Sequence, residues 1–281
     1  MSDAPKTPKK KSNLIYNVLL VVFAAGFLIG GYRLFDIYYH YHQADAEYSK
    51  LENTYVTAVT EEGVPTAKKE EMEALRVDYG FPALKVDFGN LLAENEDVVG
   101  WLYVDFCEVS FPVVQGPNND YYLHRTVEGQ NNRAGSIFMD YENTPDFSDM
   151  NTFIYGHNMK NGSMFGPLKA LREEGGEELR KAYPYFYIFL PNNTVRKYQI
   201  FSYYVTGDDS DSYVLFDTEK AYDQYAEKIT KRSMEQVEFD LSERPEIISL
   251  STCANDAGTT RFIVHGAWVE TFDLSLYPDL N

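Results

Sequence analysis

YPYFYIFLPNNTVRKYQIFSYYVT, residues 183–206, is the stretch of this 281-residue chain that decides its fold. Aromatic and β-branched residues fill both halves of the stretch, and these residue types favour strands. Pro191, Asn192 and Asn193 lie between the halves, where proline and asparagine favour a tight turn. The stretch therefore predicts a hairpin with strands at 183–190 and 195–206.

Six further runs of the same kind extend this pattern on both sides of the hairpin. Each run is short, rich in β-branched or aromatic residues, and bounded by turn residues. The runs lie at 98–104, 109–114, 136–140, 152–157, 247–253 and 261–270. Eight strands at this spacing indicate a mainly β domain, built as a closed barrel or a sandwich.

Two helical stretches interrupt the series of strands. Residues 164–181 predict a helix that is broken around Gly175 and Gly176. Residues 218–236 place apolar side chains on one helical face, and Asp217 or Thr218 precedes them as a candidate N-cap. The second helix therefore lies between the sixth and seventh strands.

An uncharged apolar run, LIYNVLLVVFAAGFLIGGY, occupies residues 14–32. A helix needs about 20 apolar residues to cross a bilayer, and the lysines within residues 1–13 favour a cytoplasmic N-terminus. A cleaved signal peptide is the alternative, but the run is longer than a usual signal core and no Ala-x-Ala site follows it. A buried core helix fits poorly with the flanking lysines. We expect a retained single-pass anchor, with the rest of the chain outside the membrane.

Residues 33–87 differ in composition from the strands that follow. Residues 36–50 can continue the anchor as a helix, residues 51–74 are mostly polar, and residues 70–76 predict one more short helix. We expect a helical spacer here, which lifts a domain at 88–281 off the membrane.

Charge and composition argue against several classes of function. The formal net charge is −18, whereas a nucleic-acid-binding protein needs a basic surface. The sequence contains no glycine-rich phosphate loop, and the pair His40 and His42 lacks the third ligand that a zinc site needs. We expect no cofactor and no metal, although the acidic run 208–211 leaves calcium binding open beside its reading as a solvated loop.

Two reactive side chains follow predicted strands directly. His157 ends the apolar run 152–157 and precedes a polar, glycine-containing loop, a place that suits a general acid or base. Cys253 ends the strand at 247–253, and Arg261 begins the next one. If these two strands pair, Arg261 lies beside Cys253, where a cation favours the thiolate and can donate hydrogen bonds to an oxyanion. A buried cysteine and a surface arginine remain the simpler reading of the spacing.

The second cysteine, Cys107, lies in a predicted turn between the first two strands. An exported protein can join two cysteines in a disulfide, and the spacing leaves that option open.

Several motifs resemble those of class B sortases. The run IYGHNMKNGSMF, residues 154–165, is similar to the histidine region of these enzymes, and LSTC, residues 250–253, followed by Arg261, resembles their cysteine signature. Further similar motifs are GWL at 100–102, FPVVQ at 111–115 and GSIFMD at 135–140. The resemblance covers residues 88–269 in the family's order.

The resemblance implies an eight-stranded sortase-type β-barrel with N-terminal helices and a helix between strands six and seven. It implies a membrane-bound cysteine transpeptidase that cleaves an LPxTG-like or NPxTN-like sorting signal of a secreted protein between Thr and Gly. An amine of Gram-positive peptidoglycan then accepts the acyl group. The family pattern makes Cys253 the nucleophile, His157 the acid and base, and Arg261 the oxyanion donor. The implied peptide contacts are Asn119, Leu123, Tyr155 and Ser251.

Alternatives remain at this point. The acceptor amine can belong to a pilin lysine, the enzyme can simply hydrolyse its target as a cysteine peptidase, or the domain can bind peptides without catalysis. Asp256 can orient His157 or be an ordinary loop acid. Since a disulfide with Cys107 would block Cys253, we expect Cys107 to be a thiol.

Overall fold

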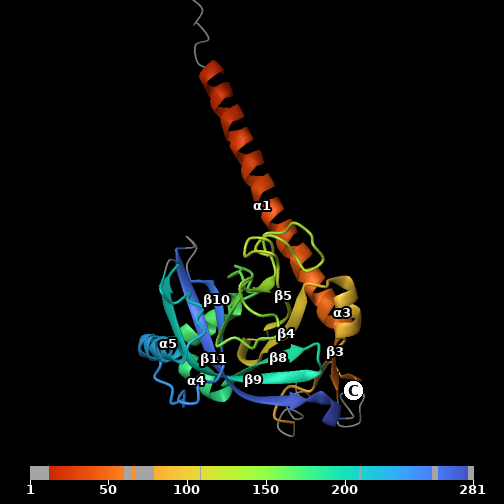
Figure 1. Ribbon diagram of the computed structural model, residues 1–281. Helices are drawn as coiled ribbons and strands as arrows, with labels where there is room; N and C mark the ends of the chain where they lie inside the picture. Colours follow the sequence, from red (N-terminus) through yellow and green to blue (C-terminus); the bar gives the residue numbers. More distant parts are fainter. Residues whose placement is uncertain are drawn as a thin grey trace, which may run out of the picture. The chain divides into compact units, whose positions relative to one another are not determined.

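The computed structural model of the chain describes residues 13–59, 65–66, 79–107, 109–208, 210–254 and 259–277 (Figure 1). The chain divides into two compact units between Gln43 and Ala44. Each unit is described by itself below.

The described part of the chain begins with helix α1 (Asn13–Tyr55), which is 43 residues long. The large apolar side chains from Ile15 to Phe35 are exposed on it. The helix is long and apolar enough to cross a membrane, and it contains the apolar run predicted as an anchor. It continues to Tyr55, past residue 50, where the sequence led us to expect its end.

The core of the second unit is a closed barrel of eight strands in the order β10-β11-β9-β8-β4-β5-β6-β7 (Figure 1). The strands are β4 (Val98–Val104), β5 (Val109–Val114), β6 (Ile137–Met139), β7 (Asn151–Tyr155), β8 (Tyr185–Leu190), β9 (Thr194–Gly207), β10 (Ile247–Cys253) and β11 (Thr260–Asp273). All eight predicted strands are confirmed. The strand pattern alone left a barrel or a sandwich open, and the eight-stranded barrel that the family resemblance implied is confirmed.

The predicted hairpin is the pair β8 and β9, in antiparallel register from Tyr185 opposite Gln199 to Leu190 opposite Thr194. Asn193 closes the turn with φ of 66°, a left-handed conformation that asparagine adopts more readily than most residues. The aromatic side chains Phe186, Tyr187 and Phe189 of β8 are all buried. Burial of these aromatic rings explains why this stretch commits the chain to a β fold.

Helix α5 (Glu219–Arg232) lies against the outside of the barrel beside β10 and β11 (Figure 1). Thr218 caps it, because the Thr218 hydroxyl accepts a hydrogen bond from the backbone N–H of Ala221 at 3.3 Å. Its buried face packs on the outer side of β9, β10 and β11. The predicted helix is confirmed, but it ends at Arg232 rather than at residue 236.

The predicted broken helix at 164–181 is two short helices. A 3-10 helix, η2 (Gly166–Arg172), is followed by α4 (Gly176–Ala182). Gly175 separates them with φ of 84°, where a side chain would be strained. Another 3-10 helix, η1 (Asp105–Cys107), forms the predicted turn between β4 and β5. Both cysteines of the chain are thiols.

Within the segment expected to be a spacer, the end of α1 belongs to the compact barrel unit, and Ala44, Tyr48 and Leu51 are buried there. Tyr48 is buried, and its hydroxyl donates to the carbonyl of Gly135 at 2.6 Å. After α1, strands β1 (Val56–Val59), β2 (Pro65–Thr66) and β3 (Leu84–Val86) form a small sheet in the order β2-β1-β3, and α3 (Phe88–Glu94) follows. The compact unit thus begins well before residue 88. The short helix expected at 70–76 lies outside the described residues.

A last 3-10 helix, η3 (Leu274–Leu276), follows β11. Asp273 caps it by accepting a hydrogen bond from the backbone N–H of Ser275 at 2.9 Å.

Candidate active site

Three strand ends meet at one rim of the barrel. β7 and β10 are parallel neighbours, with Tyr155 opposite Ser251, so both strands end at the same edge. β10 and β11 are antiparallel, with Cys253 directly opposite Arg261. The pairing of the last two strands, on which the proximity of Cys253 and Arg261 depended, is confirmed.

A cavity of about 430 Å³ opens at this rim. It is lined by all seven residues that the sequence singled out: His157, Cys253, Arg261, Asn119, Leu123, Tyr155 and Ser251. The other lining residues are Asp120, Phe138, Gly156, Asp208, Tyr213 and Thr252. The fold therefore brings one thiol, one imidazole and one guanidinium to a single hollow.

The imidazole of His157 is held in place by a hydrogen bond from one of its ring nitrogens. Its Nε2 lies 2.8 Å from the carbonyl oxygen of Leu123. A carbonyl oxygen only accepts hydrogen bonds, so Nε2 carries the proton, and Nδ1 of the neutral ring keeps its lone pair. Burial lowers the pKa of His157, and the nearby charges of His124 and Arg261 lower it further, although the bond to Leu123 opposes them. The neutral ring is thus an available proton acceptor.

The chain after β7 is held close to the barrel at Gly156. A Cβ at this position would lie 2.7 Å from the ring of Phe165, which leaves no room for a side chain. The backbone N–H of Phe165 also donates to the carbonyl of His157 at 3.0 Å. This tight loop determines where the imidazole lies.

The backbone around Cys253 is held from two other elements. Asn158 donates its Nδ2 to the carbonyl of Cys253 at 2.7 Å, and Arg172, at the end of η2, donates to the carbonyl of Ala254 at 3.0 Å. The half-buried thiol therefore stands on a fixed strand end. Arg261 lines the same cavity, and after burial, which is the main cause, its positive charge contributes to the lowered pKa of His157.

Two residues with clear roles in this geometry were missed by the sequence reasoning. Tyr213, in the loop between β9 and α5, has its hydroxyl 2.7 Å from Ser251 Oγ, and burial raises its pKa to about 12. Asp140 accepts hydrogen bonds from Asn119 and Tyr155. Asp140 ends the GSIFMD motif, which was a usable signal, whereas nothing local marks Tyr213.

Neither the zinc hypothesis at His40 and His42 nor the calcium hypothesis at residues 208–211 is supported by the described residues, which contain no cluster of three or more candidate metal ligands. In the acidic run at 208–211, Asp211 pairs with Arg232 at 2.7 Å and with Lys228 at 3.5 Å. Asp209 and Asp256 lie outside the described residues.

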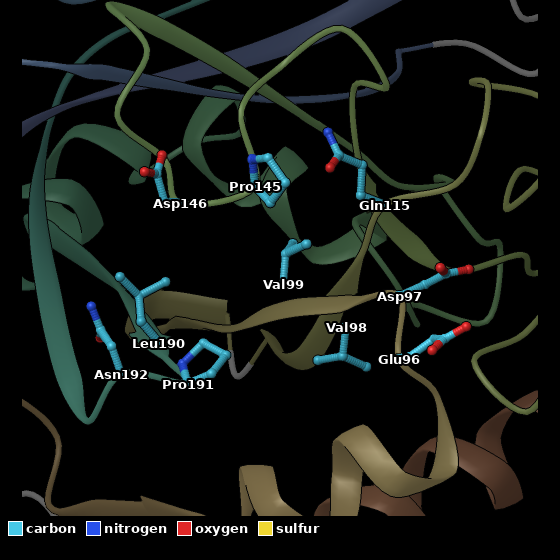
Figure 2. A pocket seen from close by; sticks show the side chains of 10 residues that line it. All are labelled: Glu96, Asp97, Val98, Val99, Gln115, Pro145, Asp146, Leu190, Pro191 and Asn192. Atoms are coloured by element: carbon cyan, nitrogen blue, oxygen red, sulfur yellow. The ribbon is translucent and has the colours of Figure 1, made fainter.

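A second cavity, of about 480 Å³, is lined by residues 96–99, Gln115, residues 145–146 and residues 190–192 (Figure 2). Figure 2 shows Val99 of β4 in the centre, with Pro145 and Asp146 above it, Leu190 to Asn192 at the lower left, and Val98 with Glu96 and Asp97 on the right. Its described lining includes carboxylates but no histidine, cysteine or cation. Nucleophilic chemistry therefore belongs to the first cavity.

A family model of the sortase domain matches residues 102–269 of the chain. The chain is also 36% identical over 181 residues to sortase B of Listeria monocytogenes, covering 62% of this chain and 71% of the relative.

The chain belongs to the class B sortases.

Two further comparisons agree with this assignment. The sortase is 28% identical over 260 residues to sortase B of Staphylococcus aureus, covering 91% of this chain and 95% of the relative. Its fold is similar to a crystal structure of B. anthracis sortase B in complex with AAEK1, with a TM-score of 0.64 and 29% identity. That likeness covers 83% of this chain and all of the other. The sortase is accordingly a cysteine transpeptidase.

Proposed function

We propose that this sortase cleaves an LPxTG-like or NPxTN-like sorting signal between its fourth and fifth residues and transfers the protein to a cell-wall amine. Cys253 is the nucleophile, His157 the acid and base, and Arg261 the oxyanion donor. The observation that carries this assignment is the pairing of Cys253 with Arg261 beside His157 in one cavity.

In the first half-reaction the proton of the Cys253 thiol passes to His157 and the sulfur attacks the Thr carbonyl carbon. Arg261 is positively charged and donates hydrogen bonds to the oxyanion as it forms. The C–N bond then breaks, and the imidazolium gives its proton to the leaving amine. The product is a thioester on Cys253, which retains the acyl-transfer potential of the peptide bond.

In the second half-reaction an amine enters the same cavity and attacks the thioester carbonyl. His157 removes the proton of the attacking nitrogen, the C–S bond breaks, and that proton returns to the sulfur. The lowered pKa of His157 supports both steps, because a neutral imidazole is ready to accept a proton at neutral pH.

Four further residues line the cavity where the peptide has to lie: Asn119, Leu123, Tyr155 and Ser251. We assign them to the binding of the sorting signal. Tyr213 joins them because its hydroxyl lies 2.7 Å from Ser251 Oγ.

Helix α1 serves as the membrane anchor in this proposal, with residues 1–13 in the cytoplasm and the catalytic domain outside. Protease treatment of intact cells that express the full chain tests this topology. Cleavage of the catalytic domain without cell lysis is expected, and its complete protection would refute the arrangement.

The enzymatic proposal is tested with the full-length protein in detergent micelles. Labelled LPxTG and NPxTN peptides are incubated with a peptidoglycan stem-peptide amine, a pilin domain that offers a lysine, or no amine. We expect an acyl-enzyme on Cys253, detected by mass spectrometry, and an amide product with the stem peptide. Product formation only with the pilin lysine would move the acceptor to a pilin, and hydrolysis alone at saturating amine would make the protein a peptidase. Unchanged turnover in Cys253→Ala would refute the assignment.

A further inference from the structure

Asp140 follows β6 directly and is a buried carboxylate, with 7% of its surface exposed. Its backbone is fixed on both sides: its N–H donates to Phe153 O at 3.0 Å, and its carbonyl accepts from Gln115 Nε2 at 2.8 Å. The carboxylate makes no ion pair with any described residue. Hydrogen bonds alone therefore hold its charge.

Three donors converge on this carboxylate. Oδ1 accepts the backbone N–H of Glu142 at 3.1 Å. Oδ2 accepts the Asn119 side-chain amide at 3.0 Å and the Tyr155 hydroxyl at 2.8 Å. Asn119 and Tyr155 both line the candidate active-site cavity, whereas Asp140 does not.

These bonds decide which way the two cavity residues face their ligand. A carboxylate only accepts, so the single proton of the Tyr155 hydroxyl points to Asp140, and the lone pairs of its oxygen remain for a ligand. Burial raises the pKa of Tyr155, which keeps that proton in place.

The side-chain amide of Asn119 is fixed in the same way. Its Oδ1 accepts the backbone N–H of Tyr141 at 3.1 Å, and one Nδ2 hydrogen goes to Asp140. The other Nδ2 hydrogen has no acceptor in the described part of the chain. The cavity wall thus offers one hydrogen-bond donor from Asn119 and one acceptor from Tyr155.

We propose that Asp140 is a positioning residue that sets the hydrogen-bond polarity of Asn119 and Tyr155, so that this wall selects an amide group of the sorting signal. An amide offers an N–H for the Tyr155 oxygen and a C=O for the Asn119 nitrogen. The inference rests on the proposed function. Both a backbone amide and an Asn side chain provide this chemistry, and the test separates them.

The variant Asp140→Asn changes the polarity with almost no change in shape. The amide that it introduces must turn its NH₂ group toward either Glu142 or the pair Asn119 and Tyr155. In the second orientation the Tyr155 hydroxyl accepts from that NH₂ group and points its own proton into the cavity, while the Asn119 Nδ2–H that bonded to Oδ2 loses its acceptor. In the first, two N–H groups oppose each other and the loop moves.

A matched control lies in the same loop. Asp149 accepts three hydrogen bonds, from the backbone N–H and hydroxyl of Thr144 and from the amide of Asn143. None of these partners lines the cavity. Asp149→Asn therefore reproduces the loss of a carboxylate without touching Asn119 or Tyr155.

The experiment measures kcat and KM of the full-length enzyme for an NPxTN peptide and two sets of analogues. In one set each backbone N–H in turn is replaced by an ester oxygen; in the other the first Asn is replaced by Leu. In the wild type we expect one replacement to lower kcat/KM by roughly tenfold to a hundredfold, mainly through KM, because it leaves a polar group of the site unpaired. An ester position identifies a backbone amide, and the Asn→Leu peptide identifies the side chain.

In Asp140→Asn that penalty should shrink to within about threefold, with kcat for the parent peptide nearly unchanged, while Asp149→Asn should keep the full penalty. Two results would overturn the inference without affecting the proposed transpeptidase function. One is a wild-type enzyme whose kcat/KM is unchanged by every peptide replacement; the other is an Asp140→Asn enzyme that loses as much kcat/KM as the wild type. A wild type that forms no acyl-enzyme with any peptide would instead refute the proposed function. If Asp140→Asn does not fold, Tyr155→Phe decides, because removing the acceptor oxygen must also abolish the penalty.

Discussion

Asn158→Ala tests whether one side chain holds the two proposed catalytic residues in register. Asn158 follows His157 directly, and its Nδ2 donates to the carbonyl of Cys253 at 2.7 Å. The bond joins segments 95 residues apart in the chain, the loop that follows β7 and the end of β10, beyond the last parallel pair of these strands, Tyr155 and Ser251. Removing it leaves the Cys253 carbonyl without this donor and releases the His157 loop.

The size of the effect follows from this geometry. An unpaired, partly buried carbonyl costs about 1–3 kcal/mol, which for a domain of this size lowers Tm by roughly 2–12 °C. Misplacing reacting groups by about 1 Å costs up to roughly a hundredfold in rate. Because Asn158 does not line the cavity, peptide binding should persist. We therefore expect kcat to fall about tenfold to a hundredfold while KM stays within about twofold.

The assay is steady-state turnover of a fluorogenic sorting peptide with saturating amine, beside thermal unfolding of the same preparations. Asn161→Ala is the control, because Asn161 lies in the same loop but donates to the exposed carboxylate of Asp45 at 2.9 Å. Its kcat should stay within about twofold of the wild type, as expected for an exposed bond. If Asn158→Ala matches Asn161→Ala in kcat, or loses activity only through KM, the register argument fails.

Three further predictions concern single residues. Arg261→Lys keeps the positive charge but loses the planar, two-pronged guanidinium, so kcat should fall roughly a hundredfold with little change in KM. Single-turnover acylation measures this fall, and a decrease of less than about threefold would deny Arg261 an oxyanion role. Tyr213→Phe removes the bond to Ser251 and should raise KM roughly fivefold to tenfold at constant kcat, whereas an unchanged KM would place the tyrosine outside peptide binding. His265 is fully buried, and burial lowers its pKa from 6.5 to about 3. Below pH 6.5 the unfolded chain therefore binds a proton that the folded protein does not bind, so the stability that is fully present above pH 6.5 is lost as the pH falls toward 3. Urea unfolding should therefore show on the order of 1 kcal/mol more stability loss between pH 7 and 5.5 in the wild type than in His265→Gln, and equal losses would contradict the assignment.

The strands were predictable because their signal is local. Each barrel strand is a short run of β-branched and aromatic residues between turn residues, and this pattern exists before any tertiary contact forms. The same holds for α5, whose buried residues Tyr222, Tyr225, Ala226 and Ile229 repeat at helical spacing. The small sheet of β1, β2 and β3 escaped prediction, because strands of four, two and three residues are too short to show a period.

Some residues of the candidate site were also predictable from local sequence, and others were not. His157 and Cys253 each lie at the end of an apolar run, and Arg261 begins the run after Cys253, so their positions could be inferred from adjacent residues. Tyr213 could not, because its place in the cavity depends on a loop between β9 and α5 that contacts Ser251 from 38 residues away. The role of Asp140 likewise depends on donors distant in sequence, because Tyr155 and Asn119 lie 15 and 21 residues away from it in the chain.

The sequence by itself determined the strands, the long apolar helix, the family motifs and the residue types available for chemistry. It did so because residue preferences and hydrophobic periodicity act over a few neighbouring residues. Only the tertiary structure decided that β7 lies beside β10 and that a buried carboxylate orients Asn119 and Tyr155. These features depend on pairings between distant segments, whose geometry is set by the packing of the whole barrel and leaves no local pattern in the chain.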